Sequence, residues 1–192
     1  MADRIAEEKT ALRAGIAGTA AALTEEYKKA ASAAIAEAVL SSPAFRMART
    51  VFLYRSTELE PDTRPILAAV WEAGKTALMP RCRNRPFMDA VPVLPGTEWR
   101  PGPFGIPEPM GEAFAPEEID LAVVPCVAAS PSGDRLGHGG GYYDAFLRKT
   151  GAYRLCLCFS ALLVDPIPVE AHDLKMDAVV TENAVFSALP RG

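Results

Sequence analysis

The chain has 192 residues, of which 49% are hydrophobic and 23% are charged, and its 20 basic and 24 acidic residues give a net charge of −4. These are the proportions of a globular protein, so they exclude wholesale disorder, and the length predicts a single domain over residues 1–192. The acidic balance excludes a general nucleic-acid binder, because such proteins neutralise phosphates with an excess of Lys and Arg.

The first 40 residues are rich in Ala, Glu, Lys and Leu and contain no proline, which predicts helix. We expect Gly15 and Gly18 to divide this stretch. Thr24, followed by two glutamates, is a plausible N-cap for the second part. A further helix is expected over residues 62–73, with Gly74 directly after its C-terminus.

Short apolar runs bounded by turn residues predict the strands. The expected strands are residues 49–54, 75–80, 88–93, 120–125, 153–159 and 177–181. Residues 95–118 are rich in Pro and Gly and predict a long connection, whereas a helix is expected over residues 141–149. Strands that alternate with helices predict an α/β fold, with a mixed, mostly parallel sheet flanked by helices.

The compartment is predicted from three features. The four cysteines lack C-x-x-C spacing and only two histidines are present, which excludes a zinc site of ordinary spacing. The N-terminus carries acidic residues and no apolar segment of a signal peptide. The longest apolar run, residues 121–129, is too short to cross a membrane. We therefore expect a cytoplasmic protein in a reducing environment, without membrane or nucleic-acid partners.

The segment from Arg135 to Asp144, with the sequence RLGHGGGYYD, is the most informative part of the chain. Its glycines allow close approach to a ligand, and the predicted helix that follows presents free N–H groups that attract phosphate. Asp144 could meet Mg²⁺ beside such phosphates. The segment is neither a Walker A loop nor a dinucleotide-binding motif. A tight turn, with Asp144 as a simple helix-dipole partner, is the alternative on glycine chemistry alone.

This motif resembles the R-L-G-x-G-x-G-Y-Y-D motif of the 5-formyltetrahydrofolate cyclo-ligase family. Weaker matches follow in the family's order along nearly the whole chain. They are KTALR at 9–13, Tyr54 with EPDT at 60–63, MPR at 79–81 with Met88, GIPEP at 105–109, and HD at 172–173 with Asp177 and TE at 181–182. One departure is clear: Ala129 and Ser130 replace the family's Phe-Asp before the glycine loop, which leaves open how that loop is braced.

The resemblance implies an enzyme that converts 5-formyltetrahydrofolate, including polyglutamylated forms, to 5,10-methenyltetrahydrofolate with ATP and Mg²⁺. Phosphorylation of the formyl oxygen prepares it for attack by N10, so the protein needs no nucleophile and acts by positioning and electrostatic stabilisation. The implied fold is one α/β domain like that of sugar-phosphate isomerases and CoA transferases. We expect a monomer or a weak homodimer.

The resemblance also implies roles for particular residues. Those expected to hold ATP are Lys9, Arg13, Arg135, Gly137, His138, Gly139, Gly140, Gly141, Tyr142 and Tyr143, with His138 contributing only its backbone. The expected metal ligands are Asp144 and Asp173, and the expected catalytic residues are Arg135, Tyr143 and Asp144. Substrate is expected to contact Tyr54, Glu60, Trp99 and Tyr142. We further expect the N-terminal helix to fold back, so that Lys9 and Arg13 reach the glycine loop.

Ordinary structural roles are the alternatives for these residues. Lys9 and Arg13 would form a solvated helix face, Glu60 would be a helix-entry charge, and the aromatic residues would be packing residues. The basic run at 81–85 could meet the folate tail or a nucleotide phosphate, but for Arg83 and Arg85 a solvated loop is the commoner explanation.

Two alternatives apply to the whole protein. One is a non-catalytic folate- or nucleotide-binding relative, which only the change at Ala129 and Ser130 supports. The other is an enzyme of the same fold that binds phosphorylated ligands without ATP. The paired aspartates and the N-terminal KTALR segment disfavour that second alternative, because such enzymes need no magnesium–triphosphate site.

Overall fold

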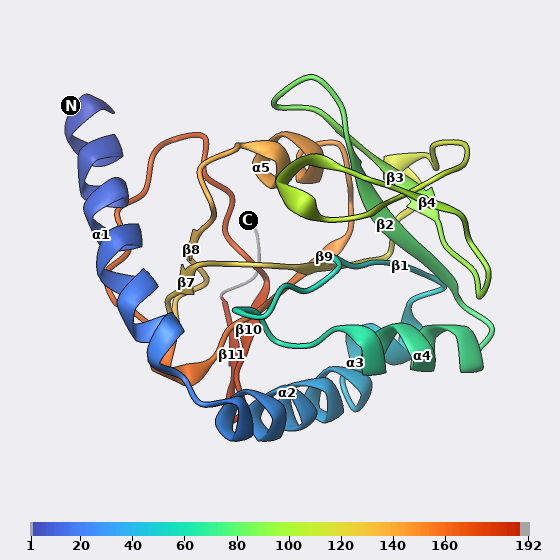
Figure 1. The fold of residues 1–192 in the computed structure, drawn as a ribbon, viewed down its shortest axis with the longest axis horizontal. Coiled ribbons are helices and arrows are strands. Elements are labelled where there is room, and N and C mark those ends of the chain that lie inside the picture. The colour runs from blue at the N-terminus through green and yellow to red at the C-terminus, as the bar shows by residue number, and fades with distance from the viewer. Residues whose placement is uncertain (1, 189–192) are drawn as a thin grey trace.

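The computed structural model describes residues 2–188 and is built around one seven-stranded sheet (Figure 1). The strands of this sheet are β1 (Thr50–Phe52), β2 (Thr76–Cys82), β3 (Met88–Pro92), β6 (Leu121–Val124), β9 (Tyr153–Leu157), β10 (Ala178–Val180) and β11 (Val185–Ser187). Their spatial order is β11-β10-β9-β6-β1-β2-β3. The central strands pair in parallel, whereas the edge strands β11 and β3 are antiparallel to their neighbours. This confirms the predicted mixed, mostly parallel sheet.

Helices cover both faces of the sheet. They are α1 (Ala2–Ala22), α2 (Glu25–Leu40), α3 (Pro43–Met47), α4 (Arg64–Glu72) and α5 (Tyr142–Leu147). Figure 1 shows α2, α3 and α4 on one side of the sheet and α5 on the other. The four residues of β6 are fully buried, as expected for a parallel strand that is covered on both faces. On the α5 side, the rings of Phe52 and Phe146 lie 4.7 Å apart between their centroids.

The N-terminal helical segment divides later than the sequence predicts. Gly15 and Gly18 lie inside α1, so the expectation that they end a helix is wrong. Both are exposed, and a Cβ at either position would meet nothing within 4 Å. An exposed glycine costs a helix only about 1 kcal/mol, which the packing of the helix can offset. The break instead falls before Thr24, whose side chain accepts a hydrogen bond from the N–H of Tyr27 at 3.2 Å, which confirms the predicted N-cap.

Short elements occupy the segments that were expected to be irregular. They are β4 (Trp99–Arg100) and β5 (Glu108–Pro109), which pair as a hairpin; β7 (Ala128–Ala129) and β8 (Arg135–Leu136), which form another; and the 3₁₀ turns η1 (Pro103–Gly105), η2 (Pro116–Glu118) and η3 (Ser160–Leu162). Strands of two residues are too short for a periodic pattern, so the sequence does not reveal them. Across residues 2–188, no helix has the length and hydropathy needed to cross a membrane.

Candidate functional site

A cavity of about 730 Å³ lies at the carboxyl ends of the parallel strands. Its walls come from α1, the segment after β1, the turn between β2 and β3, the loop of the β4–β5 hairpin, the glycine loop (residues 137–141), the start of α5, and residues 170–173. The carboxyl edge of a parallel sheet is where α/β folds commonly bind ligands, because the loops that follow neighbouring strands converge there.

The structure brings almost all predicted site residues into this one cavity. Those that line it are Lys9, Arg13, Tyr54, Glu60, Arg135, Gly137, His138, Gly139, Gly140, Gly141, Tyr142, Tyr143, Asp144 and Asp173. The predicted return of the N-terminal helix is also observed, since Arg13 Nε donates to the carbonyl of Gly137 at 2.8 Å. Lys9 does not contact the glycine loop and instead reaches the segment that contains Asp173.

Trp99 is the predicted substrate residue that the structure does not bring into the cavity. It lies at the base of the β4–β5 hairpin, paired with Pro109, and the guanidinium of Arg55 covers its ring at 5.0 Å. Phe104, at the tip of the same hairpin, lines the cavity instead and is 81% exposed. Sequence reasoning missed Phe104 because nothing in its local pattern shows which end of a hairpin faces inward.

Two glycines of the glycine loop adopt positive φ angles. Gly139 has φ +88° and Gly141 has φ +73°, conformations that residues with a Cβ rarely adopt. A Cβ on Gly139 would also lie 3.5 Å from the guanidinium of Arg13. The backbone conformation therefore favours glycine at these two positions.

Arg135 and Asp144, which both line the cavity, form a partly buried ion pair. The Nη2 of Arg135 donates to Oδ2 of Asp144 at 2.8 Å, and the guanidinium lies 5.8 Å from the centroid of the Tyr143 ring. The buried Nε of Arg135 has no hydrogen-bond partner among the described residues.

The backbone before the glycine loop is braced by a serine. Ala129 and Ser130 are both fully buried, and Oγ of Ser130 accepts from the N–H of Asp134 at 3.2 Å. The N–H of Ser130 donates to the carbonyl of Asp134 at 2.9 Å. The side chain at 130 therefore closes the turn between β7 and β8, which answers the question raised by the departure from the family pattern.

Lys9 is held by two carboxylates at the opposite wall. Its Nζ donates to Oδ2 of Asp173 at 2.5 Å and to Oε2 of Glu170 at 2.8 Å. Burial alone would lower the pKa of Lys9, but the hydrogen bonds to Asp173 and Glu170 outweigh it and raise the pKa. Lys9 is therefore a cation at neutral pH.

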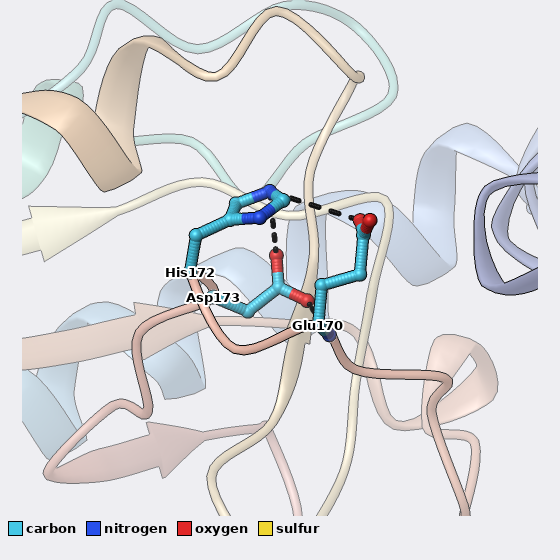
Figure 2. Close-up of side chains that lie close together, drawn as sticks. All are labelled: Glu170, His172 and Asp173. Carbon is cyan, nitrogen blue, oxygen red and sulfur yellow. Dashed lines mark hydrogen bonds and ion pairs between the residues drawn. The ribbon is translucent and has the colours of Figure 1, made fainter. Parts of the chain in front are cut away.

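Glu170, His172 and Asp173 form a cluster of metal-ligating types whose ligand atoms lie within 4.8 Å of one another (Figure 2). Asp144 is tied to the same segment, because its Oδ1 accepts from the N–H of Leu174 at 3.2 Å. Carboxylate oxygens suit Mg²⁺, so the carboxylates of Glu170 and Asp173 fit this ion once Lys9 releases them. Glu170 was missed from the sequence, where only its position three residues before Asp173 could have suggested it.

Glu60 lies at the wall formed by the segment after β1. Its side chain is only 7% exposed, and it accepts from the N–H and hydroxyl of Thr57 at 2.8 and 2.9 Å. Its Oε1 lies 3.5 Å from Nε2 of His138, which joins this wall to the glycine loop. The carboxylate lines the cavity, where it can accept hydrogen bonds from ring N–H groups of a ligand.

Three titratable groups in the cavity, Tyr143, Tyr54 and Cys82, have raised pKa values. Burial, with the charge of Glu60, raises the pKa of Tyr143 well above its usual value, so its hydroxyl stays protonated. The same two effects raise the pKa of Tyr54, whose hydroxyl donates to the carbonyl of Pro61 at 3.2 Å. Burial and the neighbouring Glu108 raise the pKa of the Cys82 thiol to about 11.

Comparison with known proteins gives a consistent family match. The profile of the 5-formyltetrahydrofolate cyclo-ligase family matches residues 5–182. The 5-formyltetrahydrofolate cyclo-ligase of Mus musculus is 28% identical over 197 residues, covering 93% of this chain and 96% of that protein. The 5-formyltetrahydrofolate cyclo-ligase of Escherichia coli K12 is 30% identical over 176 residues, covering 86% of this chain and 95% of that protein.

Two solved structures share the fold. The 5,10-methenyltetrahydrofolate synthetase of Aquifex aeolicus superposes with a TM-score of 0.84 at 29% identity, covering 96% of this chain and 94% of that one. The 5,10-methenyltetrahydrofolate synthetase of Mycoplasma pneumoniae superposes with a TM-score of 0.73 at 20% identity, covering 91% and 98%. At 20% identity, the second match supports the fold alone.

Proposed function

Because the chain belongs to the 5-formyltetrahydrofolate cyclo-ligase family, we propose that it converts 5-formyltetrahydrofolate to 5,10-methenyltetrahydrofolate and cleaves ATP to ADP and phosphate. One observation carries the assignment of the site. The N-terminal helix, the glycine loop and the Asp173 segment, which are far apart in sequence, line one cavity with their charged and backbone groups.

The proposed reaction has two steps. The formyl oxygen on N5 attacks the terminal phosphorus of ATP, and ADP leaves. N10 then attacks the formyl carbon and loses its proton, while the C–O bond breaks and phosphate leaves. The formamide oxygen is a poor leaving group until it is phosphorylated, which is why a phosphoryl donor is needed.

The protein's part in this reaction is positioning and charge stabilisation. Arg13, Arg135 and the N–H groups of the glycine loop would hold phosphate oxygens, and protonated Tyr143 could donate its hydroxyl to the same group. No protein nucleophile is required, and the high pKa of Cys82 keeps that thiol protonated at neutral pH.

Asp144, Glu170 and Asp173 would hold Mg²⁺, which when bound neutralises charge on the phosphate oxygens. Lys9 would then exchange Asp173 for a phosphate oxygen, as its buried position at the edge of the glycine-loop cavity allows. This exchange couples nucleotide binding to the release of a carboxylate.

For the folate, Glu60 would accept hydrogen bonds from the pterin N–H and amino groups. The exposed ring of Phe104 at the hairpin tip offers an apolar face beside the same cavity. Polyglutamylated folates belong to the same proposed substrate class. We further propose that residues 1–192 act as one domain in the cytoplasm, as a monomer or a weak homodimer.

The test is a spectroscopic assay of the purified protein with 5-formyltetrahydrofolate, Mg²⁺ and ATP. The methenyl chromophore in the near ultraviolet should appear only when both ATP and Mg²⁺ are present. Folate binding with no product under any condition would instead favour a non-catalytic folate-binding relative. Product formation without ATP would contradict the proposed phosphoryl transfer.

A further inference from the structure

Two arginines from distant elements, both of which line the cavity, donate to backbone carbonyls of the glycine loop. Arg13 on α1 donates to the carbonyl of Gly137 at 2.8 Å. Arg85, in the turn between β2 and β3, donates from Nη2 to the carbonyl of Gly139 at 2.6 Å and from Nε to the carbonyl of Gly140 at 3.0 Å. The sequence suggested a solvated loop for Arg85, so these two contacts are not explained by its local pattern.

The turn that carries Arg85 also packs against the loop. A Cβ on Gly141 would lie 3.6 Å from the side chain of Pro86, which follows Arg85 directly. The turn that carries Arg85 therefore lies close beside the glycine loop at Gly141 as well.

Peptide geometry gives these contacts a consequence for the N–H groups of the loop. In a trans peptide, the C=O and the following N–H point in opposite directions. Since the carbonyls of Gly139 and Gly140 face Arg85, the N–H groups of Gly140 and Gly141 point away from it. Across residues 2–188, neither N–H makes a hydrogen bond. Successive free N–H groups around left-handed glycines form a concavity that binds anions.

We propose that Arg85 is a positioning residue, which fixes the glycine loop so that the N–H groups of Gly140 and Gly141 are already oriented for phosphate when the nucleotide arrives. Glycine has the greatest backbone freedom of any residue, so a loop with three consecutive glycines would otherwise lose much entropy on binding. A guanidinium suits this role because its planar fork can hold two carbonyls in a fixed relation, whereas an ammonium cannot. The kinetic part of the inference rests on the proposed function.

The kinetic test compares Arg85→Ala and Arg85→Lys with Arg83→Ala. Arg83 is a matched control, because it lies in the same turn, its side chain is 55% exposed, and it pairs with Asp89 rather than with the loop. We expect Arg85→Ala to raise KM for MgATP about tenfold, because the loop would then have to be ordered when the nucleotide binds, with much less change in KM for 5-formyltetrahydrofolate. Arg85→Lys should recover only part of this loss.

Three kinetic results would overturn the inference. Arg85→Ala could behave like Arg83→Ala, it could raise both KM values alike, or Arg85→Lys could restore full affinity. Full affinity in Arg85→Lys would mean that the positive charge at this position is sufficient, and that the two hydrogen bonds to the carbonyls of Gly139 and Gly140 are not required.

A second measurement does not depend on turnover. Backbone ¹⁵N relaxation on the ligand-free protein gives the order parameters S² of the Gly139, Gly140 and Gly141 amides. In the wild type and in Arg83→Ala these should be near the rigid value of about 0.85, and in Arg85→Ala they should fall below about 0.6. Unchanged order in Arg85→Ala, or a loop that is already flexible in the wild type, would contradict the inference. If the wild type has no cyclo-ligase activity, the proposed function fails while this measurement still decides the role of Arg85.

Discussion

At the scale of single residues, the positive φ angle of Gly139 restricts which residues the glycine loop can accept. Gly139 and Gly96 have similar backbone angles, with φ +88° and +94°, but Gly96 lies in a turn outside the cavity. We expect alanine at either position to lower the free energy of unfolding by about 1–2 kcal/mol, because both would force a Cβ into the left-handed region. Only Gly139→Ala should also raise KM for ATP, since its Cβ would approach Arg13.

Thermal unfolding and steady-state kinetics on Gly139→Ala and Gly96→Ala separate the two effects. An equal rise in KM for ATP in both variants would show that the conformation of the glycine loop has no specific effect on ATP binding.

Glu60 allows a second prediction at this scale, directed at the folate. Replacing it by Gln keeps the shape but removes the charge that pterin N–H groups would share. We expect Glu60→Gln to raise KM for 5-formyltetrahydrofolate about tenfold and to leave KM for ATP nearly unchanged. Glu58→Gln is the control, because Glu58 is exposed in the same segment. Similar increases for both substrates would instead indicate a structural role for Glu60.

At the scale of elements, Glu182, which lies just after β10, joins the start of α2 to η3. Its Oε1 accepts from the hydroxyl of Tyr27 at 2.5 Å, and its Oε2 accepts from the N–H of Ser160 at 3.0 Å. The helix α1 packs against η3, so this carboxylate helps to place the helix that carries Lys9 and Arg13. Burial would raise the pKa of Glu182, but the hydrogen bonds from Ser160 and Tyr27 outweigh it and lower the pKa.

The lowered pKa of Glu182 determines how its contribution to stability changes with pH. A carboxyl whose pKa is lower in the folded state contributes stability above its unfolded value of 4.5, and this contribution is lost as pH falls through the folded pKa. We expect Glu182→Gln to lower the free energy of unfolding by about 1–2 kcal/mol at pH 7, with the difference shrinking below pH 4.5. Denaturant unfolding over this pH range measures it, with Glu37→Gln, an exposed change on α2, as control. A difference that stays constant with pH would exclude the charge as its source.

At the scale of the whole molecule, α1 closes one side of the cavity, where Lys9 pairs with Asp173 and Glu170. Lys9 already occupies Asp173, so Mg²⁺ alone should bind weakly and shift the unfolding temperature little. MgATP offers phosphate oxygens to Lys9 and frees Asp173, so it should stabilise the fold by about 2.7 kcal/mol at a hundred times its dissociation constant.

Thermal unfolding with Mg²⁺, ATP and MgATP tests this coupling. Lys9→Met should increase the response to Mg²⁺ alone, whereas Lys29→Met, an exposed change on α2, should not. If Mg²⁺ alone raised the unfolding temperature as much as MgATP does, the proposed coupling between nucleotide binding and the release of Asp173 would be contradicted.

The α/β class, the main strands and the glycine loop are predictable from the amino-acid sequence, because buried strands are apolar runs and a left-handed backbone favours glycine. The sequence also indicated the charges at Lys9, Arg13, Glu60 and Asp173 through the motifs that carry them. Folding alone brings Arg85 to the glycine loop and Glu170 to Lys9, and it places Phe104 rather than Trp99 in the cavity wall. Arg85 bonds to a backbone carbonyl 54 residues away, and Glu170 to a lysine 161 residues away. A contact with a backbone carbonyl leaves no signature in the identity of the residue that accepts it, so such partners emerge only when the chain folds.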